Sequence, residues 1–266
     1  MTKTSPVISI ITVVLNNSGG FRLTAGSVMA QRYPGIEFIV IDGGSTDGTL
    51  QHIREISGRI HYWVSEPDNG IYDAMNKGIE QATGEWIVFL NAGDVFAGPD
   101  VLSRIFARDF SGTDVIYGDS IADYSQFMAL RRAGSPEHLW KGMPFSHQAL
   151  FVRSSLVKTH QFSTEFTIAA DFDQVYRLYK DNSRFLHFPE PVCIVEVEGV
   201  SNQRYLRSWK ERYTIYKKSG DATAIRTLFY GAVLITFIAT MAAYRLLSSS
   251  LLMRILKYRY RKEICK

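Results

Sequence analysis

The sequence predicts an α/β fold in which a mostly parallel sheet is flanked by helices. Three observations support this prediction. From residue 7 to about residue 119, short apolar runs alternate with helical patterns. The runs are apolar at nearly every position, which is typical of strands covered by helices on both faces. Polar turns follow several of the runs, at the places where ligands bind in such sheets.

The expected elements follow in order along the chain. The first strand is residues 7–15 (VISIITVVL). A buried strand is preferred to a signal peptide here because the run is β-branched and no small-residue cleavage site follows it. Further strands are expected at 36–41, 60–64, 85–90 and 114–118, and helices between them at roughly 21–32, 48–57, 71–82 and 100–108.

The second half of the chain is less regular. A helical pattern covers 171–181, a basic amphipathic pattern covers 203–219, and an uncharged stretch covers 227–244. We therefore expect an α/β domain at 1–200 and a basic, helical region at 201–266. Segments that could form further strands are 126–132, 147–152, 184–188 and 191–197.

Composition favours a globular protein from a reducing compartment. The chain has 266 residues, 46% of them hydrophobic, which is enough for a sizeable core. Its two cysteines, Cys193 and Cys265, lie far apart and show neither zinc-ligand nor disulfide spacing.

Charge separates the two regions. Residues 201–266 contain 14 Lys and Arg but 3 Asp and Glu, a net charge of +11. The whole chain carries +4, so the first 200 residues carry −7. An acidic domain is therefore joined to a basic region, as in proteins that bind anionic surfaces.

The uncharged stretch 227–244 suggests membrane contact. Its 18 residues are near the lower limit for a spanning helix, and basic residues flank both sides, whereas spanning helices usually show that bias on one side. A helix or helical hairpin lying on anionic lipid is favoured over a true span and over a buried core helix. The apolar centre of this region suits lipid better than nucleic acid, so no nucleic-acid partner is expected.

Candidate ligand-binding residues lie at the predicted strand ends. Thr12 and Asn16 lie near the end of the first strand, and Asp42 ends the second, before GGSTDGT (43–49). This turn has neither the spacing of G-x-G-x-x-G nor the Lys-Ser/Thr of a P-loop. Asp42 is equally consistent with ligand contact and with a turn residue, whereas Asp47 is better interpreted as a helix cap.

The segment after the third strand, SEPDNGIYDAMNKGI (65–79), has a turn and a helix. Asp68 lies in the turn, where it leads into the helical pattern. Asp73 and Lys77 are four residues apart, the spacing of a simple surface ion pair.

Three further residues have more than one interpretation. Asp94 follows the fourth strand in FLNAGD (89–94) and is either turn chemistry or a ligand for a hard cation shared with a phosphate. Asp171 is either a helix N-cap, in a capping box with Gln174, or a catalytic base. His147 is ambiguous between a hydrogen-bonded, partly buried histidine and a ligand contact.

Taken together, these segments make the chain resemble family-2 glycosyltransferases over about residues 7–200. The branch that builds bacterial exopolysaccharides such as colanic acid looks most similar. The resemblance implies a Rossmann-like GT-A fold and inverting transfer from a nucleotide-diphosphate-sugar. The matching segments, in order, are SIITVVLN (9–16), VIDGGSTDGT (40–49), SEPDNGIYDAMNKGIEQATGEWIVFLNAGD (65–94) and AADFD (169–173).

The resemblance also implies residue roles. Asp94 matches the acid that holds Mg²⁺ or Mn²⁺ on the diphosphate, and Asp171 matches the catalytic base. The positions that match the nucleotide-sugar site or its surroundings are Thr12, Asn16, Asp42, Asp68, Lys77, Asn91, His147 and Gln148.

The chain departs from the family pattern at two places. Many members read Asp-x-Asp-Asp where this chain has Asn91, Ala92, Gly93 and Asp94, so Asp94 is expected to hold the metal largely alone. Residues 203–209 do not fit the Gln-x-x-Arg-Trp motif of the processive synthases, which favours transfer of one sugar over polymerisation.

The expected acceptor is a polyprenyl-diphosphate-linked saccharide in exopolysaccharide, capsule or O-antigen assembly, at the cytoplasmic face of the bacterial inner membrane. One alternative is a sugar-phosphate nucleotidyltransferase, but residues 16–24 offer only Arg22 to a triphosphate. A non-catalytic membrane scaffold is the other, and the presence of Asp42, Asp94 and Asp171 together argues against it.

Overall fold

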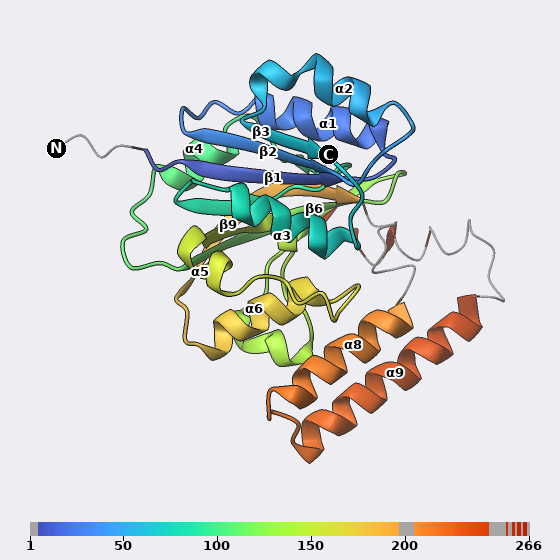
Figure 1. Ribbon diagram of the computed structural model, residues 1–266. Coiled ribbons are helices and arrows are strands. Elements are labelled where there is room, and N and C mark those ends of the chain that lie inside the picture. The colour runs from blue at the N-terminus through green and yellow to red at the C-terminus, as the bar shows by residue number, and fades with distance from the viewer. Residues whose placement is uncertain are drawn as a thin grey trace.

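The structure, a computed structural model, describes residues 5–196 and 205–244, together with residues 254, 257, 258, 260, 261, 263 and 264. Within these residues the strands form one nine-stranded sheet in the order β3-β2-β1-β4-β8-β6-β9-β5, with β7 paired to β6. Helices cover both of its faces (Figure 1). The predicted α/β class is therefore confirmed.

The first half of the sheet is parallel. Strands β3, β2, β1 and β4 pair side by side in one direction, as the alternation of strand and helix patterns predicts. The strands are β1 (Ile8–Val14), β2 (Ile36–Asp42), β3 (Tyr62–Ser65) and β4 (Trp86–Phe89). The helices between and after them are α1 (Ser18–Met29), α2 (Thr49–Glu55), α3 (Ile71–Gln81) and α4 (Val101–Phe106).

The second half of the sheet is mixed. Strand β8 lies antiparallel between β4 and β6, whereas β6 and β9 pair in parallel. The expectation of a mostly parallel sheet therefore holds only for the first half, because apolar periodicity shows that a strand exists but not its direction. The strands are β5 (Val95–Phe96), β6 (Val115–Asp123), β7 (Met128–Arg131), β8 (Leu150–Arg153) and β9 (Phe185–Glu196).

Strand β9 joins two segments that the sequence predicts separately, 184–188 and 191–197. A register irregularity at Asp119 accommodates Pro189 and Pro191, where the two segments meet. Residue 197 lies outside the described residues.

Two apolar layers enclose the sheet. Successive residues of β1 belong to different layers: Ile10 packs with Phe21 of α1, and Ile11 packs with Ile79 of α3. Helices α1, α2 and α4 cover one face, and α3, α5 (Ser154–Thr159) and α6 (Ala170–Lys180) cover the other. This is why β1 is buried at every position and apolar at all but Ser9 and Thr12.

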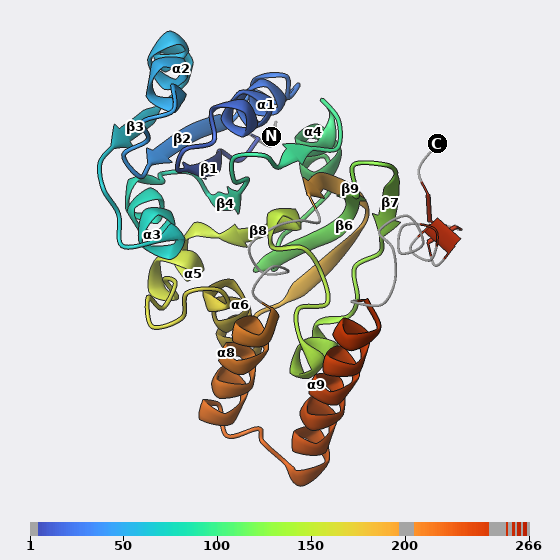
Figure 2. The same cartoon turned by 90° about the vertical axis from the view of Figure 1, so that its right-hand side faces the viewer.

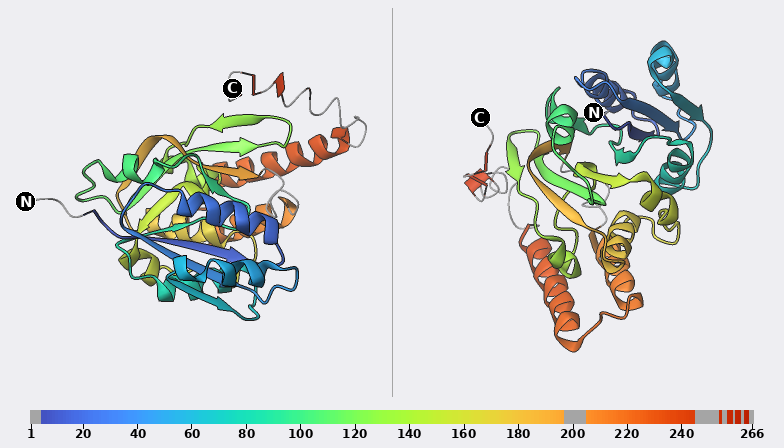
Figure 3. Two further views of the ribbon diagram at one scale, coloured as in Figure 1. Left: turned by 90° about the horizontal axis from the view of Figure 1, so that it is seen from above. Right: turned by 90° about the vertical axis from the view of Figure 1, so that its left-hand side faces the viewer.

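The C-terminal region forms a helical hairpin of α8 (Tyr205–Lys218) and α9 (Ala224–Tyr244). The rings of Tyr205 and Phe237 stack across it at 3.8 Å, and the indole N–H of Trp209 donates to the carbonyl of Tyr230. Figures 2 and 3 show that the hairpin extends from the end of the domain opposite α1 and α2. Residues 203 and 204 of the predicted helix, and most basic residues after 244, lie outside the described residues.

None of the helices in the described ranges combines the length and the hydropathy that crossing a bilayer requires.

Candidate active site

The turns that follow β1, β2 and β4 meet at one edge of the sheet. The backbone N–H of Asn16 donates to Ser45 Oγ at 2.7 Å, and Asn16 Oδ1 accepts from the N–H of Thr46 at 2.8 Å. Asn17 Nδ2 donates to the carbonyl of Ala92 at 3.1 Å. These bonds join the three strand ends into one rim, with Asn16 exposed on it.

Two residues expected to line a nucleotide pocket lie beneath this rim. Thr12 is fully buried, and its hydroxyl donates to the carbonyl of Leu90 at 2.7 Å. Asp42 is also fully buried, and its carboxylate accepts hydrogen bonds from Ser45 and Ser65. Each side chain is therefore engaged by the protein and supports the rim from below, and its assignment to the nucleotide pocket stays a prediction.

Asp68 and Lys77 lie on the rim after β3. Asp68 Oδ1 accepts from the N–H of Gly70 at 2.9 Å, as a turn residue does. Lys77 lies 2.7 Å from Glu66 and 3.8 Å from Asp73, so its principal partner is not the one that helical spacing predicts. The hydrogen bond to Glu66 raises the pKa of Lys77, which remains a cation beside Asp68.

The turn Asn91–Asp94 is anchored by α1. The hydroxyl of Thr24 donates to the carbonyls of Asn91 (3.1 Å) and Asp94 (2.7 Å) and accepts from the N–H of Gly93 (3.0 Å). Gly93 has φ of +111°, a conformation that side chains disfavour. Sequence reasoning missed Thr24; its only signal is a hydroxyl at a buried position of the helix.

Asp94 occupies an environment that disfavours its charge. Burial raises the pKa of the Asp94 carboxyl from 3.8 to about 7, which the hydrogen bond from Gln148 Nε2 to Oδ2 (3.0 Å) only partly offsets. Ser146 donates in turn to Gln148 Oε1 at 2.7 Å. The amide of Gln148 is therefore fixed between the two residues.

A divalent cation fits the Asn91–Asp94 turn. The Oδ1 atom of Asn91 is buried without a hydrogen-bond partner in the described part of the chain, and Asp94 offers a carboxylate from the same turn. Both are the hard oxygen ligands that Mg²⁺ and Mn²⁺ accept. No group of three or more His, Cys, Asp or Glu with the arrangement of a metal site occurs among the described residues, so phosphate and water oxygens would complete the shell.

His147 lies between the Asp94 turn and the helix that carries Asp171. Its ring stacks on Phe89 at 5.4 Å and meets Phe162 edge-on at 5.7 Å. Burial lowers the pKa of His147 below 6.5, and the nearby Asp171 charge opposes this only partly. The imidazole is therefore neutral at pH 7.

Asp171 lies in the first turn of α6. Its Oδ1 accepts from the N–H of Phe172 at 2.8 Å and from the hydroxyl of Tyr72 at 3.1 Å. The capping-box interpretation is wrong: Ala169 is the N-cap residue, and Gln174 Nε2 donates elsewhere. Asp171 is therefore not the N-cap residue, and Tyr72 of α3 also holds its carboxylate.

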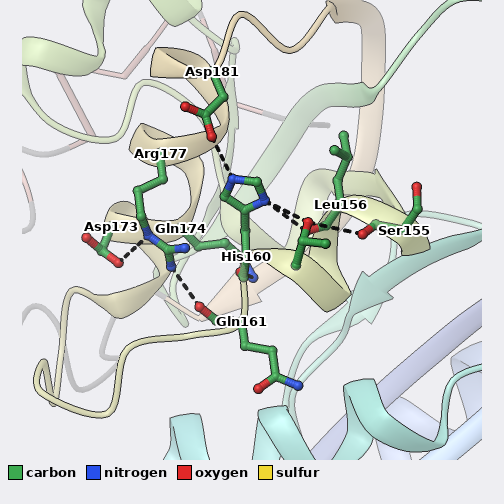
Figure 4. Close-up of polar contacts among 9 residues, drawn as sticks. Ser155, Leu156, His160, Gln161, Asp173, Gln174, Arg177 and Asp181 are labelled. Carbon is green, nitrogen blue, oxygen red and sulfur yellow. Dashed lines mark hydrogen bonds and ion pairs between the residues drawn. The ribbon is translucent and has the colours of Figure 1, made fainter.

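Polar contacts fix α6 on the domain (Figure 4). His160 Nε2 lies 2.7 Å from Asp181 near the helix end, and Arg177 Nη2 donates to the carbonyl of Gln161 at 2.7 Å. Gln174 Nε2 donates to the carbonyl of His160 at 2.7 Å. These contacts tie α6 to the chain that follows α5, so the helix that carries Asp171 is anchored along its length.

Replacing Thr24 with Val is expected to lower the free energy of unfolding by about 1–3 kcal/mol, because the N–H of Gly93 and two carbonyls lose a buried partner. The midpoint of urea unfolding measures this change. The control is Thr214→Val, which removes only a bond to Lys210 within α8 and should cost under about 0.5 kcal/mol. Equal effects of the two substitutions would contradict an anchoring role for Thr24.

Comparison with known proteins identifies relatives of the α/β domain. The family model described as "Glycosyl transferase family 2" matches residues 9–179. An uncharacterized glycosyltransferase of Mycobacterium tuberculosis is 38% identical over 187 residues, which cover 65% of this chain and 69% of that protein.

Solved structures share the fold. The mannosyltransferase PcManGT from Pyrobaculum calidifontis, in complex with GDP-Man and Mn²⁺, has a TM-score of 0.66 at 20% identity, covering 98% of this chain and 83% of its own. TarS 1-349 from S. aureus, in complex with UDP, has a TM-score of 0.60 at 18% identity and covers 79% of this chain. This chain spans 65% of the TarS chain.

Proposed function

The chain belongs to glycosyl transferase family 2, and we propose that it moves one sugar, with inversion, from a nucleotide-diphosphate-sugar to a hydroxyl of a polyprenyl-diphosphate-linked saccharide. One observation carries the proposal. The adjacent residues His147 and Gln148 connect two different acids. Gln148 Nε2 donates to Asp94 at 3.0 Å. His147 packs on Phe162, which in turn packs on Tyr72, and the Tyr72 hydroxyl binds Asp171 at 3.1 Å. These contacts support the assignment of two acids from distant parts of the sequence to one site.

Asp171 is assigned as the general base. Both of its hydrogen bonds from Phe172 and Tyr72 go to Oδ1, which leaves Oδ2 to take the proton of the attacking acceptor hydroxyl. A positioned base contributes about 10²–10⁴ in rate. Attack from the side opposite the leaving group inverts the anomeric carbon, so a nucleotide-α-sugar gives a β-linkage.

Asp94 and Asn91 are assigned to the diphosphate side of the site. They would hold Mg²⁺ or Mn²⁺, which supplies Lewis-acid stabilisation of the negative charge on the departing nucleoside diphosphate. Gln148 fixes the carboxylate of Asp94, and Thr24 fixes the turn that presents both residues. Asn16, Asp68 and Lys77 contribute polar groups of the rim to the nucleotide.

A donor panel tests the assignment. Purified full-length protein is incubated with nucleotide-sugars, with and without Mg²⁺ or Mn²⁺, and with a polyprenyl-diphosphate-linked saccharide as acceptor. Release of nucleoside diphosphate that depends on the acceptor supports the proposal. Release of pyrophosphate from a nucleoside triphosphate and a sugar phosphate would instead identify a nucleotidyltransferase.

The C-terminal hairpin is assigned to the membrane surface. Large apolar side chains on α9 are exposed, among them Leu228 (74%) and Ile235 (70%), seven residues apart and hence on one face of the helix. The surrounding sequence is basic, so this face suits anionic lipid at the cytoplasmic side of the bacterial inner membrane. A lipid-linked acceptor in exopolysaccharide, capsule or O-antigen assembly would be found at that surface.

Charging this face is expected to release the protein from vesicles. Full-length protein with Leu228→Glu and Ile235→Glu should sediment at least tenfold less with phosphatidylglycerol vesicles, because a buried Leu or Ile contributes about 1.5–3 kcal/mol. The control is Leu23→Glu on α1, an equally apolar side chain that is 62% exposed on another part of the domain. Undiminished sedimentation of the α9 variant would show that this face does not touch lipid.

A further inference from the structure

The hairpin supplies a hydrogen-bond acceptor to the segment that presents Asp171. Glu211 of α8 accepts from the backbone N–H groups of Ile168 (2.9 Å) and Ala169 (3.0 Å) and from the hydroxyl of Thr167 (3.0 Å). Its side chain is only 13% exposed. The N-cap residue of α6, Ala169, has no side-chain cap, and Glu211 binds the N–H groups of Ala169 and of the preceding Ile168 from a different helix, more than 40 residues away in sequence.

The carboxylate of Glu211 is charged at neutral pH. Burial alone would raise the pKa of Glu211, but the hydrogen bonds from Thr167, Ile168 and Ala169 outweigh it and hold the pKa below 4.5. A negative charge at a helix N-terminus is favourable because the N–H groups there point toward it. The bond between α8 and the start of α6 is therefore charge-assisted.

Tyr72 of α3 holds the same segment from the other side. Its hydroxyl lies 2.7 Å from the carbonyl of Ile168 and 3.1 Å from Asp171 Oδ1, and the residue is 8% exposed. One hydroxyl proton is shared between these two acceptors. Residues 167–171 are thus held between Tyr72 of α3 and Glu211 of α8.

We infer that Glu211 is a positioning residue for the base Asp171, with Tyr72 as its counterpart, so that the C-terminal hairpin is an integral part of the active site. The inference rests on the proposed role of Asp171 as base. Glu211 does not reach the reacting atoms; it sets the backbone from which Asp171 projects. The hairpin that we assign to the membrane surface therefore also holds, through Glu211 of α8, the backbone from which the base projects.

Replacing Glu211 with Gln removes the charge while keeping the size of the side chain. We expect kcat to fall about 10–100-fold, because a displacement of about 1 Å in a catalytic group has effects of this order. Affinity for the nucleoside diphosphate (UDP or GDP, by calorimetry) should stay within twofold, because the rim of the donor site is untouched. Unchanged kcat, or loss of nucleotide affinity together with kcat, would overturn the inference.

The matched control is Glu165→Gln. Glu165 also joins the 160s segment to α8, through an ion pair with Lys218 at 2.5 Å, but its partner does not touch residues 167–171. We expect kcat of this variant to equal that of the unmodified enzyme. A loss as large as that of Glu211→Gln would mean that any weakening of hairpin docking suffices, and that Glu211 has no specific role.

Tyr72→Phe provides a second, independent variant, with the split between kcat and nucleotide affinity as its readout. The substitution removes the hydroxyl that binds the carbonyl of Ile168 and Asp171 Oδ1. We expect kcat to fall about 10–100-fold, as for Glu211→Gln, while affinity for UDP or GDP stays within twofold. The control is Tyr176→Phe, whose buried hydroxyl binds Asp221 instead.

The outcomes separate the inference from the proposed function. Transfer by Asp171→Asn at the unmodified rate would refute the base assignment itself. If Asp171→Asn is inactive but Glu211→Gln and Tyr72→Phe both keep the kcat of the unmodified enzyme, the base assignment survives and the positioning role is overturned.

Discussion

Replacing Asp171 with Asn is expected to lower kcat by about 10²–10⁴-fold, the contribution of a general base, while the nucleotide still binds. The amide keeps the size of the carboxylate and its Oδ1 can still accept from Phe172 and Tyr72, so α6 should keep its position. The substituted Nδ2 cannot take a proton from the acceptor hydroxyl. The effect therefore isolates the chemical step.

Acceptor-dependent release of nucleoside diphosphate measures this loss, and calorimetric titration with UDP or GDP measures donor-site integrity. The control is Asp173→Asn on the same helix, whose carboxylate pairs with Arg177 one turn further along. It should keep activity within a few-fold. An Asp171→Asn enzyme that transfers sugar at the unmodified rate would leave the reaction without its assigned base.

Replacing Asp94 with Asn is expected to lower kcat by at least about 10²-fold at every metal concentration, since metal stabilisation of a leaving group contributes several kcal/mol. The chain has Asn91 and Gly93 where related enzymes often have acids, so no neighbouring carboxylate in the turn replaces Asp94. Activity measured over a Mn²⁺ series tests this. Recovery of most of the activity at high Mn²⁺ would show that the amide of Asn91 and other groups hold the ion without Asp94.

The same variant has an opposite expected effect on stability. The pKa of Asp94 is raised in the folded protein to about 7, so the folded state binds the proton more tightly than the unfolded chain does. Stability of the metal-free protein should then decrease as pH rises from about 4 to 7, by at most about 1.4 kcal/mol per unit. Asp94→Asn should remove this dependence and raise the free energy of unfolding at pH 8.

Urea unfolding of both proteins at pH 5 and pH 8, in the presence of EDTA, measures the effect. The difference in free energy of unfolding between the two proteins should be larger at pH 8 than at pH 5, by about 1–3 kcal/mol. Metal binding follows the same logic, because the ion competes with the proton of Asp94 below pH 7. If the difference in free energy of unfolding did not change with pH, burial would not raise the pKa of Asp94 in the folded protein.

The parallel half of the sheet is predictable because its signals are local. Strands β1 to β4 begin and end within about two residues of the predicted runs, since apolar residues at successive positions require burial on both faces. Local signals also place Asp94 at the ligand edge, because it follows the carboxyl end of such a strand. The direction of β8 is not predictable in this way, because it depends on the path of the preceding chain rather than on its own residues.

The candidate site also combines features that local sequence shows with features that it does not show. The sequence points to Asn16, Asp94 and Asp171 because each follows or begins a recognisable element. It points equally to Thr12 and Asp42, whose buried side chains bind the carbonyl of Leu90 and the hydroxyls of Ser45 and Ser65. Local pattern shows that a polar residue stands at a strand end, and does not show which way its hydrogen bonds are directed.

The family and the α/β class follow from the sequence alone, and the sequence also proposes the two acids of the site, because all three depend on the order of strand ends along the chain. What holds the acids in place emerges only from the packing of the folded chain. Thr24, Tyr72 and Glu211 act on residues 69, 99 and 42 positions away. Sequence periodicity cannot predict a hydrogen bond between residues so far apart, because the bond forms only after packing has brought the helices together.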